Sequence, residues 1–142
     1  MRFAMNTNVL LWILQGFLAL FFALGSGAPK LLLPVEALPM PIALPDWFVR
    51  FIGTAEVLGA LGLVLPGIFR TRLGVMPLAA GGLVLLTICA TVYQLLAQQP
   101  ANAIFAAVMC LLCATVALGR WRRLASARRA SGQPAVATAA SL

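Results

Sequence analysis

Residues 47–65 read WFVRFIGTAEVLGALGLVL, and only Arg50 and Glu56 in this stretch are charged. A helix needs roughly 20 apolar residues to cross a hydrocarbon core of about 30 Å. The apolar residues here follow one another without the alternation that marks a transmembrane β-strand. Because a helix also satisfies its own backbone hydrogen bonds in lipid, the stretch predicts a membrane-spanning helix.

Three further stretches of the chain are similarly long, apolar and poor in charged residues. Of all residues, 63% are hydrophobic and 9% are charged, whereas a soluble globular domain has roughly 25% charged residues. We therefore predict an all-α membrane protein, a four-transmembrane-helix bundle whose membrane domain occupies residues 1–121. The predicted spans cover residues 9–28, 47–65, 73–96 and 101–118.

The first span also resembles a signal peptide in one respect, because Gly25–Ala28 are small residues of the kind found at cleavage sites. Its apolar run is long for a signal peptide, however, and only Arg2 precedes it as a basic residue. We therefore favour a retained span over a cleaved one.

The connection over residues 29–46 holds five of the nine prolines and is otherwise apolar. Proline breaks helices, so no further span is expected here. We predict that this segment lies at the membrane interface or folds back as a cap, with Trp47 as an interfacial anchor. Residues 97–100 form a short uncharged connection, which predicts an antiparallel hairpin of the last two spans.

Basic residues are distributed unequally over the two ends of the predicted bundle. Four spans place both termini on one side, which then carries eight basic residues against two on the other. By the positive-inside rule, the N and C termini are both predicted to be cytoplasmic, and residues 29–46 extracytoplasmic. The eight residues are Arg2, Arg70, Arg72, Arg120, Arg122, Arg123, Arg128 and Arg129.

The net charge of +7 would indicate nucleic-acid binding in a soluble protein. Here the basic residues flank apolar spans, which indicates topology and contact with anionic lipid instead. The lipid bilayer is the predicted partner, and nucleic acid is not. Residues 122–142 are predicted to be a basic and then disordered cytoplasmic tail.

Glu56 lies nine residues beyond Trp47, about 13 Å deep by the rise of a helix. A charged side chain there costs roughly 2.5–3.5 kcal/mol, so we expect it to face the bundle interior. It is either part of a ligand site or a packing residue satisfied by its neighbours. Gly53, Gly59 and Gly62 surround it at a spacing that predicts close helix packing.

Other polar residues are predicted to accompany Glu56 in the interior or at its outer mouth. Thr87 should lie at the depth of Glu56, whereas Gln15 lies deeper and could hydrogen-bond across the bundle. The outer ends of the spans carry residues that would form a polar vestibule if they converge. The candidate ligand-binding residues are thus Gln15, Lys30, Arg50, Glu56, Thr87, Tyr93 and Gln94.

Three of these candidates also have a simpler interpretation. Gln15 is explained as well by an interhelical hydrogen bond, Arg50 by snorkelling to headgroups, and Tyr93 by an interfacial position.

Several chemistries are disfavoured by what the sequence contains. There is no histidine, which argues against a zinc site, a His-ligated haem and a histidine proton relay. Cys110 and Cys113 form a C-x-x-C spacing, but they lie in the middle of an apolar span and are expected to be packing residues. Neither a metal site nor a catalytic residue is predicted, and stand-alone catalysis is disfavoured.

The chain resembles the DoxX-like family of small four-helix bacterial membrane proteins over roughly residues 9–120. The likeness rests on Leu11-Trp-Ile-Leu-Gln15, on Lys30, on Arg50-x-x-Gly53-x-x-Glu56-x-x-Gly59-x-x-Gly62 with Pro66, on Pro77-Leu-Ala-Ala and on Gly119-Arg120. The resemblance implies a multi-pass protein of the bacterial cytoplasmic (inner) membrane. Where relatives would often carry a histidine, this chain has Tyr93-Gln94, which argues against histidine-dependent redox chemistry.

The resemblance also implies a link to redox systems, since the family takes its name from a subunit of a thiosulfate–quinone oxidoreductase. The leading hypothesis is an accessory or anchor subunit for a membrane or peripheral oxidoreductase, quinone- or thiol-linked. A quinone is the only cofactor suggested, and homo-oligomerisation is left open. The alternatives are a carrier for a small hydrophobic or anionic solute and a structural scaffold without a ligand.

Overall fold

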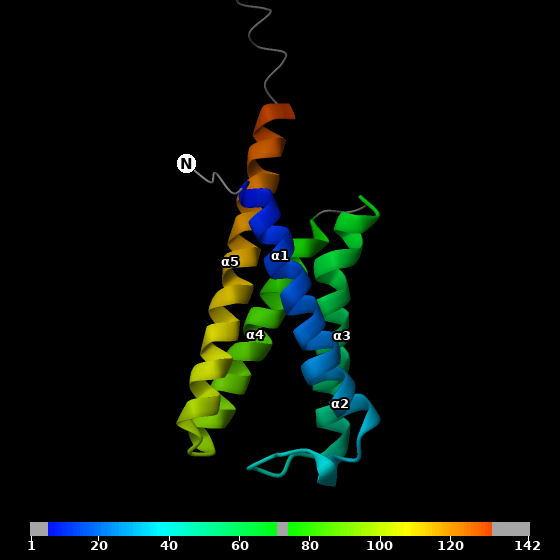
Figure 1. Cartoon of the computed structure of the whole chain (residues 1–142), viewed down its shortest axis with the longest axis vertical. Helices are drawn as coiled ribbons and strands as arrows, with labels where there is room; N and C mark the ends of the chain where they lie inside the picture. Colours follow the sequence, from blue (N-terminus) through cyan, green and yellow to red (C-terminus); the bar gives the residue numbers. More distant parts are fainter. Residues whose placement is uncertain (1–5, 71–73, 132–142) are drawn as a thin grey trace, which may run out of the picture.

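The computed structural model describes residues 6–70 and 74–131, and its regular structure within these ranges is entirely helical. Four helical rods are long and apolar enough to cross a membrane, which confirms the predicted four-helix membrane fold (Figure 1). Three of the rods are single α-helices, namely α3 (Asp46–Ile68), α4 (Val75–Leu96) and α5 (Pro100–Ser131). The first rod, Thr7–Leu32, is built from three helical segments.

These three segments are α1 (Thr7–Leu20), a π-helical segment η1 (Phe21–Gly27) and α2 (Ala28–Leu32). The rod therefore runs past Pro29, at which the sequence prediction ended the span. Pro29 lies in the first turn of α2, where a missing backbone N–H costs little. Lys30 is in consequence part of the rod and not of the following loop.

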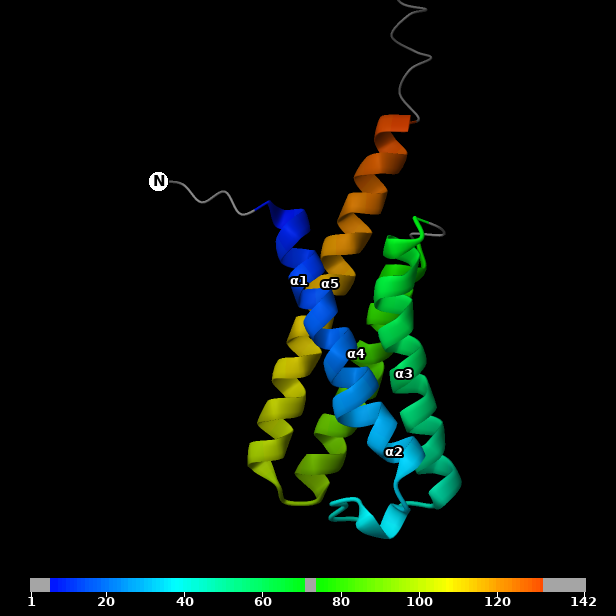
Figure 2. The same ribbon diagram turned by 45° about the vertical axis from the view of Figure 1, so that its right-hand side comes forward.

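Helix α5 extends well beyond its apolar span. The predicted span ended at residue 118, whereas the helix continues to Ser131. Residues 119–131, here called the α5 extension, contain mostly Ala, Arg, Leu and Ser and no proline, so their composition permits a helix. The extension projects past the other helices (Figure 2). Residues 132–142, for which disorder was predicted, lie outside the described residues.

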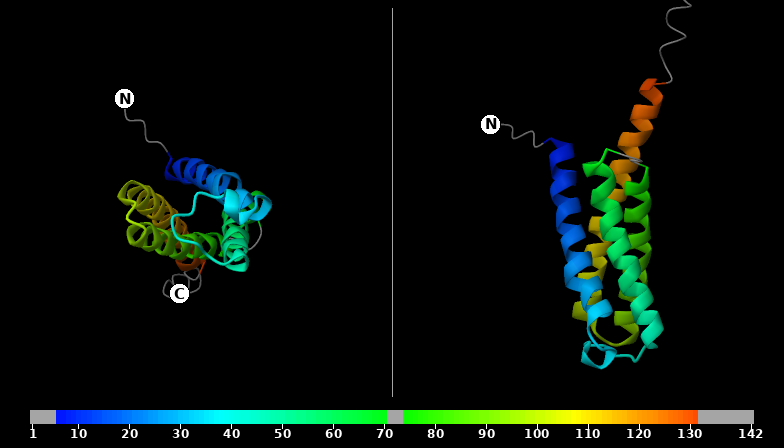
Figure 3. Two further views of the ribbon diagram at one scale, coloured as in Figure 1. Left: turned by 90° about the horizontal axis from the view of Figure 1, so that it is seen from below. Right: turned by 90° about the vertical axis from the view of Figure 1, so that its right-hand side faces the viewer.

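The proline-rich connection, residues 33–45, is here called the cap loop. It contains one short 3-10 turn, Val35–Ala37, and crosses the end of the bundle at which α3 begins (Figure 3). The Ile42 N–H donates to the Tyr93 hydroxyl oxygen at 3.0 Å, and the hydroxyl donates to the Ile42 carbonyl at 2.6 Å. These bonds fasten the cap loop to the end of α4. We call this end of the bundle the cap end and the opposite one the tail end.

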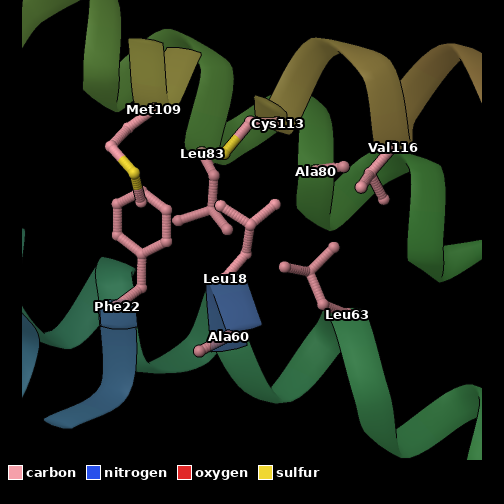
Figure 4. Packing of buried hydrophobic residues seen from close by; sticks show 9 residues of the cluster. All are labelled: Leu18, Phe22, Ala60, Leu63, Ala80, Leu83, Met109, Cys113 and Val116. Atoms are coloured by element: carbon pink, nitrogen blue, oxygen red, sulfur yellow. The ribbon is translucent and has the colours of Figure 1, made fainter. Parts of the chain in front are cut away.

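The core is a single cluster to which all four rods contribute (Figure 4). Its members are Leu18, Phe22, Ala60, Leu63, Ala80, Leu83, Met109, Cys113 and Val116. Many large apolar side chains outside this cluster are exposed, as expected for helices that face lipid. Gly59 and Gly62 allow α4 close to α3, since an added Cβ would lie 2.8 Å from Leu83 and 2.7 Å from Ala79.

Candidate functional site

Glu56 forms an ion pair with Lys30 inside the cap-end half of the bundle. The Lys30 Nζ lies 2.8 Å from both carboxylate oxygens of Glu56. The Glu56 side chain is 9% exposed and that of Lys30 is 26% exposed. The acid predicted to face the interior therefore does so, and a cation on the neighbouring rod matches its charge.

Ser26 completes this polar cluster. Its hydroxyl donates to the Glu56 carboxylate at 3.1 Å and accepts from the Lys30 Nζ at 2.8 Å. Ser26 belongs to η1 and Lys30 to α2, so the cluster includes one residue of the π-helical turn and one of the α-helix that follows it. Such π-helical turns in α-helices are frequent at functional sites. We call Ser26, Lys30 and Glu56 the acid cluster.

Two glycines bring the first rod and α3 together beside the acid cluster. A Cβ on Gly53 would lie 2.9 Å from the Lys30 Cβ and 3.1 Å from the Gly27 carbonyl oxygen. A Cβ on Gly27 would lie 3.1 Å from the Gly53 carbonyl oxygen. The Lys30 stem consequently rests on the bare backbone of Gly53, and its ammonium group reaches Glu56 one turn further along α3.

A second polar cluster, here called the glutamine cluster, lies towards the tail end. The Gln15 side chain is fully buried, and its Nε2 donates to the Leu63 carbonyl at 2.6 Å. Its Oε1 accepts from the Arg120 guanidinium, with the Nε at 2.7 Å. Arg120 also donates to Asn8 at 3.1 Å and lies over the Trp12 ring at 5.2 Å from its centroid. Gln15 thus links the first rod to α3 and α5.

Replacing Gln15 with leucine is expected to destabilise the protein by about 1–3 kcal/mol, because the Leu63 carbonyl and Arg120 both lose a buried partner. Unfolding in mixed micelles of mild detergent and SDS measures this loss. Thr54→Val is the matched control, since the Thr54 side chain is exposed and its hydroxyl donates, among the described residues, only to the Arg50 carbonyl of its own helix. Wild-type stability of Gln15→Leu would contradict the role given to this side chain.

Within the described residues, the remaining candidate residues form no hydrogen bond with Glu56. Thr87 donates to the Leu83 and Val84 carbonyls of its own helix, at 2.8 and 2.9 Å. Among the described residues, no hydrogen bond joins Thr87 to Glu56. Gln15 donates to the carbonyl of Leu63, which lies seven residues and about 10 Å beyond Glu56 along α3. Gln15 and Glu56 therefore contact α3 at different depths.

Arg50, Tyr93 and Gln94 lie near the cap end, as their positions in the sequence indicated. Arg50 donates to the Leu31 carbonyl, and its Nε lies 3.4 Å from Asp46. Tyr93 binds the cap loop through Ile42. The buried Gln94 Oε1 has no hydrogen-bond partner within the described part of the chain. Arg50 therefore links α3 to the first rod, and Tyr93 links α4 to the cap loop. Within the described residues, no hydrogen bond joins Arg50, Tyr93 and Gln94 to one another.

Sequence reasoning named Lys30 as a candidate but not its pairing with Glu56, and it missed Ser26 and Arg120 as site residues. Ser26 and Lys30 are four residues apart, a spacing that places two side chains on one helical face, and this signal could have indicated a pair aimed at Glu56. Arg120 is the first arginine after the last apolar span, but nothing in its surroundings in the sequence points to Gln15.

The described residues contain no group of three or more histidine, cysteine or acidic side chains that could hold a metal ion. Cys89, Cys110 and Cys113 are free thiols, and Cys113 is buried in the core. What the two clusters can do is fix the relative positions of the helices and hold one matched pair of charges in the apolar interior.

Comparison with known protein families identifies one family that matches this sequence. A sequence model described as the DoxX-like family matches residues 13–116. No curated protein and no solved structure matches the chain. The matched range includes Gln15, Ser26, Lys30 and Glu56 but ends before Arg120 and the α5 extension.

Proposed function

The chain belongs to the DoxX-like family, and from this premise we propose that it is an accessory subunit that anchors a quinone- or thiol-linked oxidoreductase at the bacterial cytoplasmic membrane. In this proposal both termini face the cytoplasm, as the distribution of basic residues predicts. The tail end of the bundle is then the side on which a partner protein docks.

The α5 extension is the observation that carries this proposal. It continues the membrane helix beyond the apolar span and projects past the neighbouring helices (Figure 2). Arg122, Arg123, Arg128 and Arg129 on it are all exposed, and it contains no acidic residue. A rigid basic helix of this kind offers an acidic partner a surface at a fixed distance from the membrane.

The polar clusters support an anchor more directly than they support transport. Lys30 could attract an anion at the cap end, but Glu56 already matches its charge at 2.8 Å. Both clusters bond side chains to a different rod, and so they fix the bundle that carries the α5 extension. Carriage of a solute is therefore the weaker candidate.

Neutralising Arg128 and Arg129 together with glutamine is expected to lower capture of the partner about 3- to 10-fold, since an exposed ion pair contributes up to about 1 kcal/mol. The measurement is quantitative mass spectrometry of proteins captured by the tagged full chain in mild detergent. Arg128→Lys with Arg129→Lys keeps the charge and is expected to retain capture.

Two results would count against this function. If the wild-type chain captures no oxidoreductase above a membrane-protein control, the redox role is wrong. If the glutamine variant captures the same oxidoreductase as well as the wild type does, the partner docks elsewhere than on the α5 extension.

A further inference from the structure

A groove lies between α1 and α5 in the tail-end half of the bundle. Its volume is about 830 Å³, and most of its lining is apolar. Leu10, Leu14 and Phe17 line it from α1, and Leu112 and Leu118 line it from α5. The groove thus lies at a different place from the acid cluster.

The length of the groove matches one leaflet of a bilayer. Its lining on α5 runs from Leu112 to Arg123, a rise of about 16 Å along the helix. Half of the hydrocarbon core of a bilayer is about 15 Å. An acyl chain whose headgroup lies at the tail end would consequently reach along the groove to the bilayer middle.

The tail-end mouth of the groove is basic. Arg122 and Arg123 line it and are exposed, and no acidic residue belongs to the lining. Among the described residues, neither arginine forms a salt bridge, since the two pairs present involve Lys30 and Arg50. The neighbouring Trp121 is 67% exposed, which suits the headgroup layer, where tryptophan is enriched.

We propose that this groove binds one acyl chain of an anionic phospholipid from the tail-side leaflet, with Arg122 and Arg123 holding its phosphate. A zwitterionic phospholipid or a quinone fits the apolar part but carries no net negative charge for the two arginines. The groove is therefore selective for an anionic headgroup. This site goes beyond the anchor function and does not depend on a partner protein.

The test is competition for the delipidated full chain between equal amounts of dioleoyl phosphatidylglycerol and dioleoyl phosphatidylcholine, read by native mass spectrometry. The wild type is expected to retain phosphatidylglycerol preferentially. Arg122→Gln with Arg123→Gln should reduce this preference about 10- to 30-fold, because about 1 kcal/mol per arginine corresponds to about 5-fold each.

Two matched controls separate the groove from general effects. Arg128→Gln with Arg129→Gln removes the same charge from the same helix outside the groove and should leave the preference within 2-fold of wild type. Thr115→Trp fills the groove and should reduce bound lipid, whereas Thr54→Trp should not. Both threonines are exposed and donate at 2.8 Å to the carbonyl four residues earlier.

Equal retention of the two lipids by the wild type would overturn the proposal. An equal loss of preference for phosphatidylglycerol in the Arg122/Arg123 and the Arg128/Arg129 variants would overturn it as well. Retention of phosphatidylglycerol by Thr115→Trp at the wild-type level would place the lipid outside the groove and would overturn it too. Preferential loss in Arg122→Gln with Arg123→Gln together with loss in Thr115→Trp would establish the site.

Discussion

Replacing Glu56 with alanine is expected to give one of the two largest losses of stability in this protein. Removing one partner of a buried ion pair costs about 3–5 kcal/mol. We expect the lower end of that range, because the Lys30 side chain is 26% exposed and retains some contact with solvent or headgroups. The measurement is the free energy of unfolding in mixed micelles of mild detergent and SDS.

The size of this effect comes from the charge that is left behind. The Lys30 ammonium group donates to both Glu56 oxygens and to Ser26. Without Glu56, a cation among apolar helices keeps only the Ser26 hydroxyl as a partner. Ser26 also loses the carboxylate to which it donates at 3.1 Å.

A double variant separates this cause from lost packing. Lys30→Met with Glu56→Leu removes both charges together, and replacement of a buried pair by apolar residues is often close to neutral. Glu36→Ala, a truncation in the exposed part of the cap loop, should stay within about 0.5 kcal/mol of wild type. A double variant as unstable as Glu56→Ala would contradict the argument from unpaired charge.

The fold could be predicted from the sequence because it follows from hydropathy alone. Four apolar runs and the short connection at residues 97–100 suffice to give four helices and a hairpin. The ends of the helices were predicted less well. Pro29 was taken as a stop although it lies in the first turn of a new helical segment, and Arg120 was taken to follow a helix that in fact continues to Ser131.

For the site, the sequence allowed the placement of individual residues to be predicted, but not the contacts between them. The inward direction of Glu56 followed from the cost of a charge in lipid. Its pairing with Lys30 depends on the register between two rods, which is set by the contact of Gly27 with Gly53 and by the π-helical turn of η1. A count of residues along a regular α-helix includes neither the Gly27–Gly53 contact nor the π-helical turn. The sequence prediction therefore placed Lys30 in an outer vestibule and not beside Glu56.

The second large effect is expected at Gly27, where even alanine is too large. A Cβ there would lie 2.7 Å from the Phe22 carbonyl oxygen and 2.7 Å from the Val57 Cγ2. The Phe22 carbonyl belongs to the backbone of the rod and cannot rotate away as a side chain can. Because Phe22 lies in η1 together with Gly27, this clash would distort the π-helical turn itself. The contacts with the Val57 Cγ2 and with the Gly53 carbonyl oxygen at 3.1 Å would push the first rod away from α3, at the contact that places Lys30 against Glu56.

Overpacking of a well-packed interior costs typically about 1–3 kcal/mol. We expect Gly27→Ala to lower the free energy of unfolding by the upper end of this range in the same assay, because the acid cluster is displaced together with the rod.

Gly16→Ala is the matched control on the same rod, because a Cβ there meets nothing within 4 Å. It should be neutral or stabilising by up to about 1 kcal/mol, since alanine favours a helix more than glycine does. Gly53→Ala should also be destabilising, because its Cβ would lie 2.9 Å from the Lys30 Cβ and 3.1 Å from the Gly27 carbonyl oxygen, and neither atom is the far end of a flexible side chain. If Gly27→Ala proves as stable as Gly16→Ala, the close approach of the two rods does not set the position of the ion pair.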